Sequence, residues 1–289
     1  MDLVILAAGH GRRFGGLKQL AEVGAHGEAL IDYTAIDAYS CGFDKIVLIV
    51  RAEIEGELMG HADKHWPAEI EREAIIQGPV AGTGQAVMSA APGVRGPFGV
   101  ANADDFYGRD ALEQLKSSLD DGDEGPHSLV GFRLADTMFS DEAVTRGVCR
   151  VDDAGDLIEI VEQKVRKLEG GEGFAGSPLG TDPLDPGAGG WPLTGNEIVS
   201  MNLWGFKRRM FDHLAAALDS FDPPPLAPGA NPPELLLPNV VKDLVAAGAD
   251  RFQVIDAKGQ CVGITHASDL DFMRVAIGGR RPGEMADTV

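Results

Sequence analysis

The sequence predicts an α/β fold: a Rossmann-like mixed, mostly parallel sheet with helices on both faces. The first observation is an apolar run over residues 3–8 that gives way to glycines, as a buried parallel strand gives way to a loop. The second is that apolar runs alternate with amphipathic segments through the first half of the chain. The third is the length of 289 residues, which is enough to bury a large core without disulfides.

The same patterns predict the individual elements. In the first half their alternation is typical of βαβ units. The expected strands there are 3–8, 45–50, 74–77 and 98–101, and the expected helices are 29–41, 54–65, 83–91 and 110–119. The second half is less regular, because its strands follow one another without a helix between each pair. The elements expected there are strands 128–134, 147–151, 157–163 and 199–206, and helices 235–247 and 268–277.

We expect one domain over residues 1–278. Stretches rich in glycine and proline predict mobile loops near 169–195 and 222–233. Residues 279–289 form a C-terminal tail that we expect to fray after Gly278.

Charge and composition exclude several classes of partner. The net charge is −20, from 25 Lys and Arg against 45 Asp and Glu, which argues against nucleic acids and anionic membranes. No run approaches the roughly 20 apolar residues of a membrane span. A strand directly follows Met1 and Asp2 without a leader pattern, so we expect a cytoplasmic location. Three widely spaced cysteines predict reduced thiols and no metal cluster.

The glycine-rich loop after the first strand predicts phosphate binding. Gly9 and Gly11 let the backbone approach an anion and turn its N–H groups toward it. Arg12, Arg13 and Lys18 add positive charge beside those groups. Because the rest of the chain is acidic, this is the clearest candidate for an anion site.

Two common phosphate loops fit this stretch poorly. A dinucleotide loop would read G-x-G-x-x-G with an acidic residue after the second strand, but the spacing here is longer and that strand ends in Arg51. A P-loop requires Lys and Ser or Thr directly after its last glycine, whereas Leu17 follows Gly16. A glycine-rich turn with solvated arginines is the remaining simple alternative.

The run Leu6 to Phe14, followed by Lys18, resembles the signature L-A-G-G-x-G-[TS]-R-L…P-K of the sugar-1-phosphate nucleotidyltransferases. Arg13 and Lys18 match its arginine and lysine, which implies catalytic roles. Arg12 and Leu17 depart from it, since Thr or Ser and Pro are usual there. The stretch Gly15 to Leu20 is similar to that of a bacterial branch of NDP-sugar synthases. The resemblance implies that Ala8, Gly9 and Gly11 bind the nucleotide.

A second loop resembles the segment that contacts the base in this family. Gln77 and, five residues on, Gly82 have the family's spacing, and an amide with bare backbone can offer both donors and acceptors to a base. Thr83 follows and is assigned to the same nucleotide site. The alternative is a glycine-rich start of the next helix, with Thr83 as its cap.

The resemblance also implies a magnesium site. Asp104 follows an apolar strand and matches the family's metal-binding Asp, and Mg²⁺ prefers carboxylate and phosphate oxygens. A turn or cap role suits the neighbouring Asp105 better. Many members of the family have a second metal-binding carboxylate near the end of the domain, but this sequence has Thr265 at that position. Asp269 either supplies it or sits in the first turn of a helix that Ser268 caps.

Four positions match the sugar-phosphate side of the family site. Gly147 resembles the glycine that lies against the sugar, and Asn202 a polar contact on the strand that closes the pocket. Glu162 and Lys164 resemble the residues that bind sugar hydroxyls and the sugar phosphate, although a shift of one residue would put Gln163 in place of Glu162. Solvated positions on amphipathic strands are the alternative for all four.

The resemblance implies one reaction: an NTP and a sugar-1-phosphate give an NDP-sugar and pyrophosphate, with Mg²⁺ as cofactor. It also points to a homo-oligomer. Three alternatives stay open: another phosphorylated acceptor, such as an alditol phosphate or a cofactor precursor; a non-catalytic nucleotide-binding or regulatory protein of the same fold; and, more distantly, an NAD(P)-dependent oxidoreductase. The sequence fixes neither the nucleobase nor the sugar.

Overall fold

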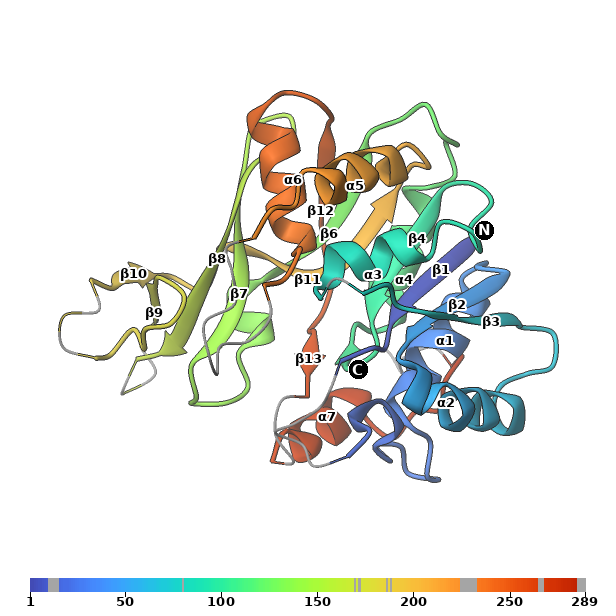
Figure 1. Cartoon of the computed structure of the whole chain (residues 1–289). Helices are drawn as coiled ribbons and strands as arrows, with labels where there is room; N and C mark the ends of the chain where they lie inside the picture. Colours follow the sequence, from blue (N-terminus) through green and yellow to red (C-terminus); the bar gives the residue numbers. More distant parts are fainter. Residues whose placement is uncertain are drawn as a thin grey trace.

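The computed structural model describes residues 1–9, 16–79, 81–168, 170, 173–185, 187, 189–223, 233–264 and 268–284. Within this part of the chain, eleven strands form one continuous sheet, and a two-stranded ribbon lies beside it (Figure 1). The large sheet consists of β1 (Asp2–Leu6), β2 (Lys45–Val50), β3 (Glu71–Ile76), β4 (Phe98–Asn102), β6 (His127–Arg133), β7 (Val144–Val151), β8 (Leu157–Lys167), β9 (Phe174–Ser177), β10 (Trp191–Leu193), β11 (Ile198–Phe206) and β12 (Phe252–Asp256). The ribbon consists of β5 (Asp105–Phe106) and β13 (Val262–Gly263).

The sheet has a parallel half and a mostly antiparallel half, in which β12 runs parallel to β6. Its order is β10-β9-β8-β7-β11-β4-β1-β2-β3, with β6 paired to both β11 and β12. β1 is parallel to β2 and β4, and β2 is parallel to β3. β11 is antiparallel to β4, β6 and β7, which joins the two halves. The register of β7 against β8 places Gly147 opposite Glu162, and that of β11 against β7 places Ser200 opposite Gly147.

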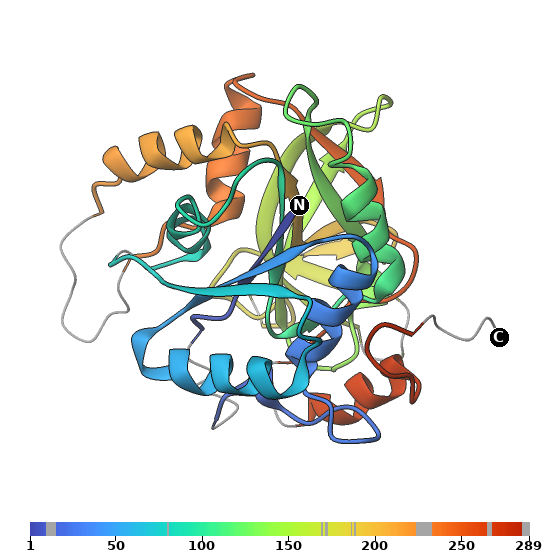
Figure 2. The same ribbon diagram turned by 90° about the vertical axis from the view of Figure 1, so that its right-hand side faces the viewer.

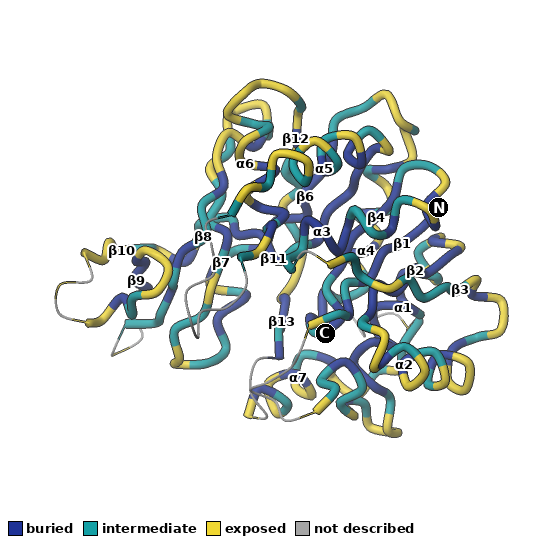
Figure 3. Tube along the Cα trace, in the orientation of Figure 1, coloured by how far each residue is buried: buried dark blue, intermediate teal, exposed yellow. Residues whose placement is uncertain are grey.

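Helices cover both faces of the sheet, as predicted (Figure 2). The helices are α1 (Leu30–Ser40), α2 (Ala52–His65), α3 (Thr83–Ser89), α4 (Arg109–Ser117), α5 (Met210–Asp219), α6 (Leu237–Ala246) and α7 (Asp269–Ile277). Successive side chains of a strand point to opposite faces of the sheet. In β1, Leu3 and Ile5 therefore pack in the core under α1, α2 and α4. Val4 faces the other core, under α3, α5 and α6. The central strands are accordingly buried along most of their length (Figure 3).

The structure differs from the sequence expectations in the second half. α5 and β12 were not expected, and β9 and β10 lie inside the stretch 169–195, which was expected to be a loop. Most of 222–233 lies outside the described residues. The tail expected to fray is packed over 279–284: Arg280 pairs with Asp37 and stacks against Tyr33 and Phe106. None of the helices described is both long and apolar enough to cross a bilayer.

Candidate active site

The candidate site lies where β1 and β4 end side by side. The Ala103 N–H donates to the Leu6 carbonyl at 3.1 Å, so the loop after each strand starts from the same edge of the sheet. Ligands of open α/β sheets bind at this carboxyl edge. The start of the glycine-rich loop is fixed by two long side chains. Gln19 donates to the Ala7 carbonyl and Arg51 donates to the Ala8 carbonyl, both at 2.9 Å.

The centre of the glycine-rich loop is outside the described residues. Gly11 and Arg13 both fall in the gap 10–15, so their predicted roles stay predictions. Gly9 is described, and a Cβ built on it meets none of the described residues within 4 Å, so these residues leave open space beside its backbone. That openness suits the close backbone approach of an anion.

Lys18 and Asp104 are brought together, although 86 residues of sequence separate them. The Lys18 ammonium forms an ion pair with the Asp104 carboxylate and also donates to the Ile264 carbonyl at 3.2 Å. The Ile264 N–H donates to the Asp104 carbonyl oxygen at 2.9 Å. The loop after β1, the turn after β4 and the end of β13 therefore meet around one carboxylate.

Asp105 is buried beside Asp104 and has a different environment. Its carboxylate accepts from the Asn102 side-chain amide at 2.8 Å. Burial, reinforced by the neighbouring Asp104 charge, raises the pKa of Asp105 to about 7. The Asp104 side chain is 27% exposed, so it is the carboxylate of the two that a ligand reaches. Asp105 lies in β5 and caps no helix, since Gly108 precedes α4.

A polar cavity of about 240 Å³ adjoins Asp104 on the side of β7, β8 and β11. Gly147 and Glu162 line it together with Asn202. Burial, reinforced by the Glu234 carboxylate, raises the pKa of Glu162. Within the described residues, the Glu162 side chain has neither a hydrogen bond nor an ion pair. A half-buried carboxylate without donors is suited to hydroxyl groups of a ligand.

The register of β8 decides between Glu162 and Gln163. Glu162 and Lys164 are two residues apart and therefore share a face of the strand. Gln163 is buried and accepts from the Trp191 indole N–H at 3.0 Å, so it is not available to a ligand. Lys164 lines a neighbouring cavity of about 190 Å³, which also reaches Asp104. Glu162 and Lys164 thus flank the same region.

Asn202 lies at an irregularity of β11. The pairing of β11 with β6 shifts between Ser200 and Trp204, and Asn202 has φ 57°, a left-handed conformation that Asn tolerates better than most residues. Its side-chain oxygen accepts from the Trp204 indole N–H at 3.3 Å. The bulge turns this part of the strand into the polar cavity.

Arg146 is a site residue that the sequence reasoning did not assign. It lines both cavities, and its guanidinium donates to the Thr137 hydroxyl at 3.0 Å and to the Thr137 carbonyl at 2.6 Å. Burial lowers its pKa. Arg146 directly precedes Gly147, which the resemblance did single out. It holds the loop after β6 over the cavity that Lys164 lines.

Gln77, Gly82 and Thr83 lie together at the start of α3. The Gln77 side-chain amide donates to the Gly82 carbonyl at 3.2 Å. Gly82 has φ 109°, and a Cβ there would lie 2.4 Å from the Leu235 carbonyl oxygen, so glycine is required. Gly82, not Thr83, precedes the helix. The Thr83 hydroxyl accepts from the Leu237 N–H at 2.9 Å, which ties this loop to α6.

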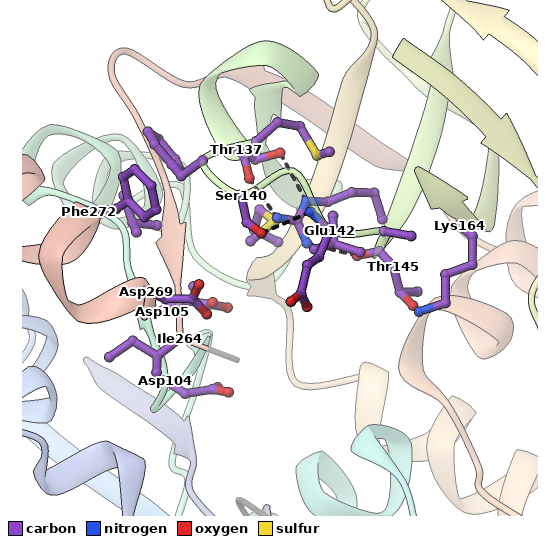
Figure 4. Close-up of a pocket in the computed structure, with 18 residues that line it drawn as sticks. Asp104, Asp105, Thr137, Ser140, Glu142, Thr145, Lys164, Ile264, Asp269 and Phe272 are labelled. Carbon is purple, nitrogen blue, oxygen red and sulfur yellow. Dashed lines mark hydrogen bonds between the residues drawn. The ribbon is translucent and has the colours of Figure 1, made fainter. Parts of the chain in front are cut away.

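Asp269 is buried in the first turn of α7 and lines the same cavity as Lys164, together with Asp104 and Asp105. Figure 4 shows these three side chains on one side of the cavity, with Glu142 and Lys164 on the other. Ser268 precedes the helix without a side-chain capping bond. Thr265 lies outside the described residues. Oxygen donors of this kind fit a hard divalent cation, and Lys18 and Lys164 fit phosphate oxygens.

The structure closely resembles those of several nucleotidyltransferases. An inositol-1-phosphate CTP transferase from T. maritima has a TM-score of 0.66 at 15% identity, covering 97% of both chains. A protein assigned as a glucose-1-phosphate thymidylyltransferase from Bacillus anthracis has a TM-score of 0.68 at 13% identity, covering 98% of both. A UDP-glucose pyrophosphorylase from Acinetobacter baumannii has a TM-score of 0.63 at 16% identity, covering 98% of this chain and 95% of that one. No curated protein matches the sequence significantly.

The fold and the carboxylate-lined edge of the sheet define a protein of the nucleotidyltransferase class. Residues 3–222 match the model of the MobA-like NTP transferase domain, and the chain belongs to that family. The prediction of a nucleotidyltransferase with a mixed α/β sheet is therefore confirmed.

Proposed function

We propose that this protein transfers a nucleotidyl group from an NTP to a sugar-1-phosphate, releasing pyrophosphate and an NDP-sugar. The observation that carries the proposal is the polar cavity next to Asp104, in which Glu162 has no donor among the described residues. Hydroxyls of a sugar would satisfy that carboxylate, and Lys164 would neutralise the phosphate on the same sugar. The fold shared with sugar-phosphate nucleotidyltransferases supports this choice of acceptor.

The nucleotide would enter from the edge formed by the ends of β1 and β4. Gln77 and the backbone around Gly82 would contact the base, and the backbone of Ala8, Gly9 and Gly11 would contact the phosphates. Thr83 would act indirectly, since its hydroxyl already binds the Leu237 N–H. A narrow turn with an amide and an exposed backbone offers the donors and acceptors that a base edge requires.

The reaction requires positioning and charge neutralisation and no covalent enzyme intermediate. An oxygen of the sugar phosphate attacks the α-phosphorus in line with the departing pyrophosphate. Lys164 would hold the attacking phosphate, Lys18 would lie near the α-phosphate, and Arg13 would bind the leaving pyrophosphate. The opposite charges of these groups and the phosphates lower the cost of bringing two anions together.

Mg²⁺ fits the oxygen donors at this edge, with Asp104 as the principal ligand and Asp269 as a second. When bound, the ion would neutralise charge on the phosphates. The Asp104 carboxylate is accessible, and Asp269 lines the same cavity, so both can turn toward one ion. Asp105 would stay outside this role, because it is buried against Asn102.

A panel of acceptors tests the proposal. Pyrophosphate release is measured with Mg²⁺ for each NTP and dTTP, in the presence of sugar-1-phosphates, alditol phosphates or inositol-1-phosphate. Inositol-1-phosphate is included because a CTP transferase for it shares the fold. Release that needs one NTP together with one sugar-1-phosphate supports the proposal. Release only with a non-sugar acceptor favours the alternative reaction, and tight NTP binding without release favours a non-catalytic role.

A further inference from the structure

Lys18 contacts Asp104, the carboxylate that we propose as the principal ligand of the divalent cation. Its ammonium pairs with Asp104, and its second contact is the Ile264 carbonyl at 3.2 Å. The side chains of Lys18 and Asp104 are 17% and 27% exposed, so the pair is partly shielded from water. Such a pair is stronger than one on an open surface, where exposed ion pairs contribute little.

An ammonium and a divalent cation cannot share this position. Both would approach the same carboxylate, and their like charges would repel at contact distance. The cation must therefore displace Lys18 before it binds Asp104 at its full strength. The Lys18 side chain can leave without backbone movement, because it is a flexible four-carbon stem.

From these contacts we infer that Lys18 acts as a latch on Asp104: in the nucleotide-free protein it suppresses divalent cation binding, and it frees the carboxylate only when another anion takes the ammonium. This inference rests on the proposed function, which makes Asp104 a metal ligand. NTP phosphates are the anions that would draw Lys18 away, so cation and nucleotide would bind as coupled ligands.

The charge distribution around the pair explains why the latch would be needed. Asp104, Asp105 and Asp269 line one cavity, and Lys18 is the ammonium in contact with the accessible member. Without that ammonium the carboxylates would attract a cation in the absence of substrate and would repel the phosphates of an incoming nucleotide. With it, the site is closer to neutral until the nucleotide arrives.

Mn²⁺ binding to the nucleotide-free protein tests the latch by electron paramagnetic resonance. Lys18→Met removes the ammonium and keeps the length of the side chain, and Lys18→Gln is a second variant with the same purpose. We expect both to bind Mn²⁺ about tenfold more tightly than the unchanged protein, within the ordinary range of coupling between two ligands. In the double variant Lys18→Met/Asp104→Asn the gain should disappear.

Lys116→Met is the matched control, because Lys116 also pairs with a carboxylate, Asp120, but outside the site. It should leave Mn²⁺ affinity unchanged, which excludes a general effect of the more negative charge. Unchanged or weaker Mn²⁺ binding in the folded Lys18 variants would overturn the latch. So would a gain that survives Asp104→Asn. The Mn²⁺ titration contains neither NTP nor acceptor. Absence of pyrophosphate release with every acceptor would therefore refute the proposed function without changing the measured Mn²⁺ affinities.

Discussion

The Tyr107 hydroxyl donates a hydrogen bond to the Met201 carbonyl oxygen at 2.8 Å. The same hydroxyl oxygen accepts from the Asn102 N–H at 2.9 Å. Tyr107 is 2% exposed, so neither contact is shared with bulk water. One buried phenol thus links the end of β4, next to the proposed metal carboxylate, to the bulged part of β11 that carries Asn202. The proposed metal side and the proposed acceptor side of the site are held in one arrangement.

Replacing Tyr107 with Phe should loosen this link. Two buried backbone groups lose a partner, which we expect to lower the free energy of unfolding by about 1–3 kcal/mol. The acceptor KM should rise more than the NTP KM, because Met201 adjoins the acceptor cavity. Urea unfolding and steady-state kinetics measure both effects. Tyr39→Phe, on α1 and outside the site, is the control. Unchanged stability and unchanged acceptor KM would refute this role of Tyr107.

Asp104 and Asp105 should respond differently to the same change. Asp104→Asn removes the accessible carboxylate, and we expect pyrophosphate release to fall by at least about 100-fold, the scale of a lost transition-state contact. Asp105→Asn keeps an oxygen for the Asn102 amide and should retain most of the activity. Circular dichroism checks that both variants fold. If Asp105→Asn were the inactive variant, the metal site would be wrongly assigned.

Glu162 and Gln163 form a matched pair for the acceptor side. Glu162→Ala should raise the KM for the sugar phosphate by about tenfold, the cost of one charged hydrogen-bond partner, and leave the NTP KM nearly unchanged. Gln163→Ala should leave the acceptor KM nearly unchanged, because its side chain binds Trp191 on the other face. Initial rates at varied acceptor concentration separate the two. The reverse pattern would place β8 in the other register.

A buried histidine should make the protein sensitive to acid. The His127 Nδ1 accepts from the Lys207 N–H at 3.0 Å, so its Nε2–H is assigned as the donor to Asp250 at 3.1 Å. Asp250 also binds Arg209 through both carboxylate oxygens, at 2.7 and 2.8 Å. His213, His127 and Asp250 have the composition of a metal cluster. However, both ring nitrogens of His127 and both carboxylate oxygens of Asp250 already have hydrogen-bond partners in the protein, and His213 Nε2 lies 3.1 Å from Asp250. The group is a structural hydrogen-bond network.

Burial lowers the pKa of His127 from 6.5 to about 4. The unfolded chain therefore binds more protons than the native protein between these values, and stability falls as the pH falls from 6.5 to 4. Full loss of this contribution amounts to about 3 kcal/mol. Urea unfolding at several pH values measures it. His127→Gln should flatten the slope in this window, and an equal slope in both proteins would show that other groups cause the acid sensitivity.

The C-terminal segment should contribute to stability through Arg280. Its guanidinium donates to both carboxylate oxygens of Asp37, which is 1% exposed, and stacks against Tyr33 and Phe106 at 5.2 Å each. Arg280→Ala would leave the Asp37 charge buried without its partner, and we expect a loss of about 3 kcal/mol. Thermal unfolding measures it. Arg281→Ala is the neighbouring control and should change little; equal effects of both would contradict this role.

Sequence patterns predict the helices and strands that can be identified from the residues of one short stretch. β2 was predicted with the observed bounds, because a fully buried strand reads as one apolar run. α5 was missed, and so was β12, whose partly exposed residues alternate weakly between the faces. The tail after Gly278 was expected to fray because its sequence carries no sign of the buried Asp37 that receives Arg280. Such contacts between distant segments are invisible to local patterns.

The site residues also divide into those that a local motif identifies and those whose role depends on a distant contact. Asp104 and Lys18 could be singled out because they follow strand ends in recognisable motifs. The role of Tyr107 depends on Met201, 94 residues away, and nothing near either residue predicts that contact. The choice between Glu162 and Gln163 needed the register of β8 against β7, which sequence alone leaves open by one residue. Gly11 and Arg13 stay predictions.

Pyrophosphate release is the most direct test of the central claim. It is measured with Mg²⁺ across all pairs of the four NTPs and dTTP with a panel of sugar-1-phosphates. We predict release that requires one NTP and one sugar-1-phosphate together, and its loss in Asp104→Asn. Absence of release with every sugar-1-phosphate, while NTP binding is intact, would contradict it.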